Sequence, residues 1–179
     1  FRSAAIGVAQ LERITEILSK RAQIAQWYDE ELADLGELVQ SVLLLLRSDL
    51  LNKGIEITLL TPALPMANGD RVQLQQVILN LIVNAFEAMD SSEWQKNLQI
   101  QTREADGQVV MKVVDSGPGI AADKLNSVFE PFVTTKKEGL GLGLALSHSI
   151  ITAHNGRLWA ENNPEGGAIF QIALPAIKT

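Results

Sequence analysis

The stretch that decides the fold reads Val110-Met111-Lys112-Val113-Val114-Asp115-Ser116-Gly117-Pro118-Gly119-Ile120. Its first five residues are mostly apolar and β-branched and are too few for a helix that could stand alone, so we expect a buried strand. Asp115 ends this strand, and a turn rich in glycine and proline follows. We expect this carboxylate to be a surface-facing group of a cleft, where only a ligand or the chain itself can supply its hydrogen-bond partner.

A second glycine-rich stretch follows further along the chain: Gly139-Leu140-Gly141-Leu142-Gly143-Leu144-Ala145-Leu146. Glycines let backbone N–H groups come close to an anion, because they carry no Cβ. The helix that we expect to begin here directs its positive end to the same place. A carboxylate that can read a base and a helix start that can hold phosphates together predict a nucleotide site.

The composition is that of a soluble globular chain of 179 residues, with 46% apolar and 20% charged residues. Its net charge of −6 argues against nucleic acid as a partner. The absence of cysteine excludes disulfides and thiolate metal sites. No apolar run approaches the ~20 residues of a membrane span and no signal peptide opens the chain. We therefore expect a cytoplasmic fragment without membrane contact, cut from a larger protein because it starts at Phe1.

Residues 1–35 have few helix breakers and carry a heptad stripe, which favours helix pairing. Its apolar members are Leu11, Ile14, Leu18, Ala25, Tyr28, Leu32 and Leu35. Arg21 takes the one position of the stripe, between Leu18 and Ala25, that has no apolar residue. Two interpretations stay open: this helix lies on its own domain, or it forms a homodimer, which its length favours. We expect the working domain to comprise residues 36–179.

Part of this N-terminal segment is similar to another family. Residues 4–32, which include Ala4-Ala5-Ile6-Gly7-Val8-Ala9-Gln10-Leu11-Glu12-Arg13, resemble a helical stretch of pyridoxal-phosphate-dependent sugar aminotransferases. The resemblance includes none of that family's cofactor residues, so it implies no activity. It implies a segment recombined from elsewhere, which would suit an oligomerising role.

The remaining pattern alternates between helical and strand periodicity. It predicts a helix over Glu37–Leu51 that Gly54 ends, and a helix over Arg71–Met89 that Asp70 caps. The apolar side of the second helix should include Val72. The other expected elements are strands over Ile55–Leu59, Leu98–Thr102, Val109–Val114, Arg157–Glu161 and Ala168–Leu174, helices over Ala121–Phe129 and Gly141–His154, and a mobile loop over Glu130–Glu138.

Asn80 and Asn84 stand one turn apart inside the apolar helix Arg71–Met89. Asparagine is a poor residue for a helix interior, so this pair needs a reason. One reading is two exposed amides on a wet face. The other is a pair of amide oxygens directed at a hard cation or a phosphate-bound water, and oxygen ligands suit Mg²⁺.

Other nucleotide and metal motifs fail on spacing. Leu144 and Leu146 stand where a dinucleotide fingerprint needs its third glycine, and the Gly-Lys-Ser/Thr of a P-loop is absent. The catalytic-loop and metal-binding motifs of protein kinases are also absent. His148 and His154 lie six residues apart, on different faces of their helix, so we predict that both are structural.

Five ordered motifs resemble the N, G1, F and G2 boxes of sensor histidine kinases. They are Asn80-Leu81-Ile82-Val83-Asn84-Ala85, Asp115-Ser116-Gly117-Pro118-Gly119-Ile120, Phe129-Glu130-Pro131-Phe132, Thr134-Thr135-Lys136 and Gly139-Leu140-Gly141-Leu142-Gly143-Leu144. The resemblance covers residues 36–175. It implies an α+β protein with the Bergerat fold, an α/β sandwich in which three helices cover a mixed, mostly antiparallel sheet, shared with gyrase, Hsp90 and MutL ATPases.

The resemblance also implies ATP and Mg²⁺ as cofactors and assigns roles by position. Asp115 would accept a hydrogen bond from the adenine amino group, Asn84 would bind Mg²⁺, and Asn80 would be the catalytic residue beside the phosphates. The remaining nucleotide-binding residues would be Gly117, Gly119 and Ile120 of the base pocket, Thr134, Thr135 and Lys136 of the lid, and Gly139, Leu140, Gly141, Leu142, Gly143 and Leu144 of the hinge and phosphate loop. We expect the lid, residues 130–142, to be disordered without nucleotide.

Three features depart from the family pattern. Glu87 stands where many members carry a lysine that reaches the phosphates, and Ala168 replaces a Ser or Thr that steadies the base-binding aspartate. Residues 1–35 contain no histidine, so the phosphoacceptor helix pair is not recognisable here.

The expected function is therefore that of the ATP-binding catalytic domain of a sensor histidine kinase. It would act on a histidine of a separate phosphoacceptor domain, serve a response regulator, and not phosphorylate itself. Two alternatives remain, an autonomous ATPase of the same fold and a dimeric interaction module with a vestigial nucleotide site. Asn80 argues against the ATPase, because those hydrolases use a glutamate there and an amide is a poor base.

Overall fold

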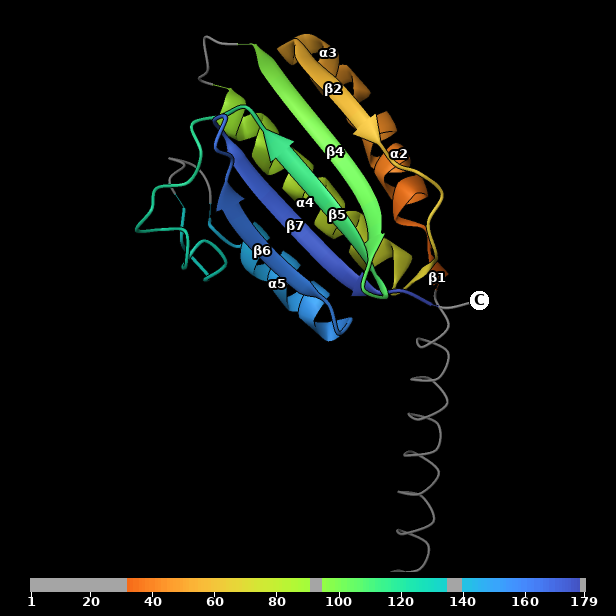
Figure 1. The fold of residues 1–179 in the computed structure, drawn as a ribbon. Coiled ribbons are helices and arrows are strands. Elements are labelled where there is room, and N and C mark those ends of the chain that lie inside the picture. Colours follow the sequence, from red (N-terminus) through yellow and green to blue (C-terminus); the bar gives the residue numbers. More distant parts are fainter. Residues whose placement is uncertain (1–31, 91–94, 135–139, 178–179) are drawn as a thin grey trace, which may run out of the picture. The chain divides into compact units, whose positions relative to one another are not determined.

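The computed structural model describes residues 32–90, 95–134 and 140–177 (Figure 1). The chain divides into two compact units, Phe1–Glu31 and Leu32–Thr179. The predicted helix over residues 1–35 thus lies mostly outside the described residues. It is wrong at its end, where Leu32–Ala33 forms strand β1 and pairs with β3, Ala67–Asn68.

A five-stranded sheet forms the centre of the second unit, in the order β2-β4-β5-β7-β6. Strand β2 runs parallel to β4, and the other neighbouring pairs are antiparallel. This mixed, mostly antiparallel sheet confirms the predicted fold class. The strands are β2 (Ile55–Leu60), β4 (Lys96–Ala105), β5 (Gln108–Asp115), β6 (Arg157–Asn162) and β7 (Ala168–Pro175).

Helices of the described residues cover one face of this sheet (Figure 1). They are α2 (Leu35–Leu45), α3 (Arg47–Lys53), α4 (Arg71–Met89) and α5 (Gly143–Ala153). There is one more than the three that the family resemblance implies, because the backbone at Leu46 (φ −89°, ψ 3°) divides the expected helix Glu37–Leu51 into two. The left-handed Gly54 ends α3, as predicted.

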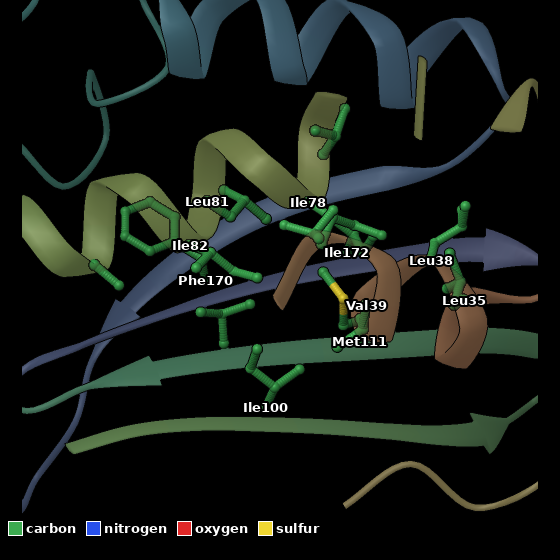
Figure 2. Packing of buried hydrophobic residues seen from close by; sticks show 14 of the residues in the cluster. Leu35, Leu38, Val39, Ile78, Leu81, Ile82, Ile100, Met111, Phe170 and Ile172 are labelled. Atoms are coloured by element: carbon green, nitrogen blue, oxygen red, sulfur yellow. The ribbon is translucent and has the colours of Figure 1, made fainter. Parts of the chain in front are cut away.

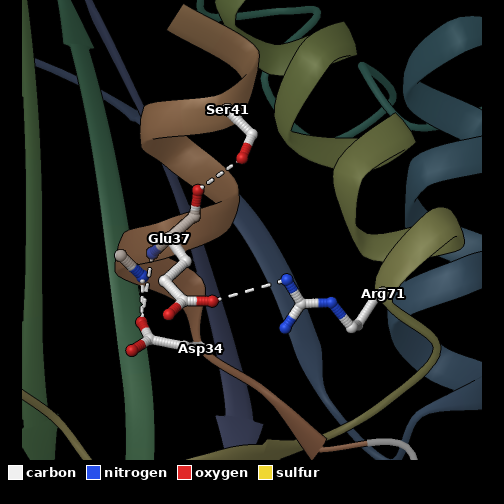
Figure 3. Close-up of polar contacts among 5 residues, drawn as sticks. Asp34, Glu37, Ser41 and Arg71 are labelled. Atoms are coloured by element: carbon white, nitrogen blue, oxygen red, sulfur yellow. Dashed lines mark hydrogen bonds and ion pairs between the residues drawn. The ribbon is translucent and has the colours of Figure 1, made fainter.

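The first turn of α2 is fixed by polar contacts (Figure 3). The Asp34 carboxylate accepts hydrogen bonds from the N–H groups of Gly36 (2.7 Å) and Glu37 (3.2 Å). Such a cap stabilises a helix by about 1 kcal/mol. Glu37 also pairs with Arg71 of α4 at 3.4 Å, an exposed ion pair that links the starts of the two helices.

The core lies between the helices and the covered face of the sheet (Figure 2). Helix α4 has the predicted bounds and the predicted Asp70 cap, and Ile78, Leu81 and Ile82 of its buried face are fully enclosed. The placement of Val72 on the apolar side is wrong, since Val72 is 75% exposed. It precedes the buried Leu74 by two residues, which puts it on the opposite side of the helix.

Two predictions between the sheet strands also differ from the structure. Residues 122–129 form turns rather than a helix, with i+3 hydrogen bonds such as Lys124 N to Ala121 O (2.8 Å). Helix α5 starts at Gly143 rather than Gly141, because Gly141 has φ 66° and cannot be helical.

Candidate functional site

Asp115 ends β5 and is buried, with 2% of its surface exposed. Its prediction as a surface-facing group is wrong, because strand alternation places its side chain on the helix-covered face with Met111 and Val113. Burial raises the pKa of Asp115, and hydrogen bonds from the chain partly oppose this rise. Those bonds come from the N–H groups of Gly117 (2.8 Å) and Ala168 (3.2 Å), and both reach Oδ1.

Ala168 therefore steadies the aspartate through its backbone, although its methyl side chain cannot. The expected loss of a Ser or Thr hydroxyl at this position removes a side-chain partner only. The Oδ2 atom of Asp115 is not used by either of these two bonds.

The turn after Asp115 packs so closely against its neighbours that two of its positions require glycine. A Cβ on Gly117 would lie 2.9 Å from Asp115 Oδ1 and 3.2 Å from the carbonyl oxygen of Ala88 in α4. Gly119 has φ 78°, a left-handed conformation that side chains disfavour. Both glycines predicted for the base site thus have a structural reason to be glycine.

Two polar side chains that the sequence patterns did not single out hold this turn. Ser116 Oγ accepts a hydrogen bond from Asn97 N (2.9 Å) and donates one to Gln95 O (3.0 Å). Asn162, at the end of β6, accepts from Ile120 N (2.7 Å) and donates to Ile120 O (2.8 Å). The only signal for Asn162 in the sequence is an asparagine pair before a proline, which indicates a turn and no more.

The asparagines of α4 lie between this turn and the start of α5. Asn80 Nδ2 donates a hydrogen bond to Ser147 Oγ of α5 (2.9 Å), and Ser147 is buried. A Cβ on Gly143 would collide with the Asn80 side chain, so the start of α5 lies directly against Asn80. Asn84 is half-buried and lies one turn further along α4. Along the helix axis it is roughly 6 Å from Asn80 on one side and from Ala88, which borders Gly117, on the other.

The second glycine stretch brings the two ends of the predicted lid together. Phe132 N donates to Gly141 O (3.0 Å), and Leu140 and Phe132 are each 76% exposed. The N-cap residue of α5, Leu142, makes no side-chain hydrogen bond to the first turn, and the positive end of a helix attracts anions. Of the predicted lid and loop residues, Thr134, Leu140, Gly141, Leu142, Gly143 and Leu144 are described, whereas Thr135, Lys136 and Gly139 lie outside the described residues.

The histidines have structural contacts, as predicted. His154 accepts a hydrogen bond from Asp70 N at Nε2 (3.0 Å), and its Nδ1 lies 2.8 Å from Ile150 O, which it can donate to. The His148 ring lies 5.6 Å from that of Phe129, which in turn contacts Phe170 edge-on at 6.3 Å. In the described part of the chain, no three His, Cys, Asp or Glu side chains gather as a metal site.

No helix within residues 32–90, 95–134 and 140–177 is both long and apolar enough to cross a bilayer.

Residues 69–178 match the sequence model of a family described as histidine kinase-, DNA gyrase B-, and HSP90-like ATPase. Residues 2–79 match the DegT/DnrJ/EryC1/StrS aminotransferase family, in line with the resemblance at the N-terminus. The second match covers less than half of the chain and carries no activity.

The chain is 45% identical over 117 residues to the sensor protein FixL of Bradyrhizobium diazoefficiens, covering 65% of this chain and 23% of that protein. It is 43% identical over 131 residues to the C4-dicarboxylate transport sensor protein DctB of Rhizobium meliloti, covering 73% and 21%. The chain thus spans less than a quarter of the length of these two relatives.

Among solved structures, the catalytic domain of histidine kinase ThkA is similar with a TM-score of 0.73 and 30% identity, covering 82% of this chain and 96% of that one. Full-length ShkA in complex with AMPPNP has a TM-score of 0.72 and 31% identity, covering 83% and 32%. ThkA in complex with the response regulator TrrA has a TM-score of 0.71 and 25% identity, covering 93% and 49%.

Proposed function

Since the chain belongs to the histidine kinase-, gyrase B- and HSP90-like ATPases and is the ATP-binding catalytic domain of a sensor histidine kinase, we propose that it transfers the γ-phosphoryl group of Mg²⁺-bound ATP to a histidine of a separate phosphoacceptor domain. The observation that carries this proposal is a buried carboxylate, Asp115, held by backbone N–H groups beside a glycine turn.

Adenine recognition follows from that arrangement. Two N–H groups fix Asp115 Oδ1, so Oδ2 is oriented and can accept a hydrogen bond from the amino group of adenine. A charge-assisted bond of this kind contributes about 1.5–3 kcal/mol. A guanine would present a carbonyl oxygen at the same place, which a carboxylate repels. Gly117, Gly119 and Ile120 would line the base.

Asn80 and Asn84 fit a magnesium ion by the chemistry of their amide oxygens. Because Asn80 Nδ2 donates to Ser147, its oxygen is on the other side of the amide, facing the start of α5. Asn84 would be the metal ligand and Asn80 the residue beside the transferred group. The ion would supply charge neutralisation for the phosphates.

The start of α5 is the proposed phosphate site. The N–H groups of its first turn and its positive end favour an anion within hydrogen-bond distance of Gly141, Leu142, Gly143 and Leu144. The family resemblance implies a lid over residues 130–142, with Gly139, Gly141 and Gly143 as its hinge glycines and Thr134, Thr135 and Lys136 among its residues. Closing over ATP would exclude water from the reaction.

The wider assignment follows the family. We expect a response regulator as the downstream partner, a cytoplasmic location and a homodimer formed through the N-terminal segment. The working domain starts at Leu32, four residues before the predicted start. Both histidines of the chain lie on or at the end of α5 in structural contacts, so we expect no autophosphorylation of this chain alone.

The test is to titrate the chain with AMPPNP and Mg²⁺ and then to supply γ-labelled ATP with a purified phosphoacceptor domain of a sensor histidine kinase. We expect binding, and label on the acceptor histidine that is stable to alkali and labile to acid. If the chain released phosphate from ATP at several turnovers per minute without an acceptor, it would be an autonomous ATPase instead. If AMPPNP failed to bind at millimolar concentration, the chain would be an interaction module with a vestigial nucleotide site.

A further inference from the structure

The side chain of Asn162 forms a closed pair of hydrogen bonds with the backbone of Ile120. The Ile120 N–H donates to Oδ1 at 2.7 Å, and Nδ2 donates to the Ile120 carbonyl at 2.8 Å. Only one orientation of the amide matches donor to acceptor on both sides, so the two bonds define it. Forty-two positions separate the two residues in the chain.

Gly119 makes room for this contact. A Cβ at position 119 would lie 2.9 Å from Asn162 Oδ1 and 3.2 Å from the carbonyl oxygen of Gly167. The requirement for glycine there thus comes from the β6–β7 hairpin as well as from its φ of 78°. The turn and the hairpin are built against each other.

The same hairpin also holds Asp115. Its strand β7 starts at Ala168, whose N–H donates to Asp115 Oδ1. The hairpin closes through Asn163 N to Gly167 O (2.9 Å), which joins Asn162 at the end of β6 to the start of β7. One hairpin therefore contacts Asp115 at one end of the turn and Ile120 at its other end.

We propose that Asn162 is a positioning residue for nucleotide recognition, which sets the selectivity for adenine by holding the Gly117–Ile120 turn at a fixed place relative to Asp115. This inference rests on the proposed function. Asn162 itself is exposed, and it is not one of the residues proposed to contact the base. It acts through its two hydrogen bonds to Ile120, which prevent the turn from shifting when a purine binds.

The first measurement is hydrogen exchange of the Ile120 amide in the wild-type chain without nucleotide. We expect protection, because this N–H donates to the side chain of Asn162 at the end of β6, and we expect the protection to be lost in Asn162→Ala. Exchange of the wild-type Ile120 amide at the rate of an open loop would overturn the inference, whatever nucleotide binding shows.

The second measurement compares ADP and GDP affinity in Asn162→Ala, with Asn163→Ala as the matched control. Asn163 is the neighbouring asparagine, and its side chain accepts a 3.3 Å bond from Glu165 N within the hairpin and none from Ile120. We expect Asn162→Ala to weaken ADP binding about tenfold and to reduce the ADP-to-GDP preference, as the loss of two neutral hydrogen bonds predicts. Asn163→Ala should keep both values.

Wild-type ADP affinity and selectivity in Asn162→Ala would contradict the positioning role. An equal loss in Asn163→Ala would also contradict it, since it would assign the effect to the hairpin in general. If the wild-type chain bound no ADP, the proposed function would fail. The exchange rate of the Ile120 amide would still decide whether Asn162 holds the turn through its hydrogen bonds.

Discussion

Asp115 combines burial with a fixed orientation, and both properties come from its position in the sheet. The last residue of β5 points to the helix-covered face, and the neighbouring N–H groups of Gly117 and Ala168 hold one of its oxygens. Burial disfavours the charge, so the site holds a carboxylate at the expense of folding free energy. Such a loss is common where a group is kept for a ligand.

We predict that Asp115→Asn keeps the fold and loses adenine nucleotide binding. The amide oxygen of asparagine can accept the same two backbone hydrogen bonds, whereas its NH₂ group would oppose the amino group of adenine. The expected loss is at least about 10- to 100-fold in affinity, from one charge-assisted bond. Calorimetric titration with ADP would measure it, and unchanged affinity with an unchanged melting temperature would show that Asp115 does not read the base.

The raised pKa of Asp115 makes a second prediction, on pH. Between the ordinary value of 3.8 and the higher pKa of the folded state, the folded chain binds more protons than the unfolded chain, so this group makes stability fall as pH rises. The amide of the Asp115→Asn variant does not titrate. The melting temperature of this variant minus that of the wild type, both without nucleotide, should therefore increase from about pH 4 upward across this window. If this difference in melting temperature stayed constant with pH, the pKa of Asp115 would not be raised by folding.

Nucleotide affinity should increase with pH, whereas the stability contribution of Asp115 decreases, because adenine binding needs the carboxylate. Affinity should therefore weaken as the pH is lowered through the raised pKa of Asp115.

At the scale of elements, α4 connects the two halves of the site. Its Asn80 contacts the start of α5, and its Ala88 borders the turn after β5, with Asn84 between them. The sequence allowed the bounds and cap of α4 to be predicted, because a long apolar period and a capping aspartate agree there. It did not show the break at Leu46, since no glycine or proline marks it.

We predict that Ser147→Ala disturbs the phosphate end of the site and leaves base recognition intact. Removing the hydroxyl frees Asn80 Nδ2, so the amide is no longer held with its oxygen facing Gly143. The loss of one hydrogen bond predicts an effect of about five- to tenfold on phosphoryl transfer.

The matched control is Ser149→Ala, since Ser149 lies on the same helix but is exposed and donates its hydrogen bond to Ala145 O of its own helix (3.0 Å). Transfer rates with a phosphoacceptor domain and affinity for adenosine would be measured for both variants. If the two variants transferred phosphate equally fast, the orientation of Asn80 by Ser147 would play no part in catalysis.

For the whole molecule, the fold class and the order of the motifs followed from the sequence, and the contacts between distant residues did not. The short apolar, β-branched run of β5 and its terminal aspartate predicted a site at that strand end. The burial of Asp115 depends on α4, the amide of Asn162 finds Ile120 across the sheet, and Ser147 reaches Asn80 from another helix. The periodicity of apolar residues along the chain cannot predict such contacts, because they form only when distant elements pack together.

The division of the chain after Glu31 makes a prediction on assembly. If residues 1–35 pair two copies through their heptad stripe, the full chain should sediment as a dimer and a chain that begins at Leu32 as a monomer. Both chains should bind ADP equally, since every described site residue lies beyond residue 32. Monomeric behaviour of the full chain at high micromolar concentration would remove the dimer from this account.

Adenine recognition by Asp115 is tested most directly by a crystal structure of the chain with AMPPNP and Mg²⁺. We predict that the adenine amino group lies about 3 Å from Asp115 Oδ2, and that the amide oxygens of Asn80 and Asn84 face the metal and the triphosphate. A purine bound away from the Gly117–Ile120 turn, or asparagines that face neither the metal nor a phosphate, would contradict it.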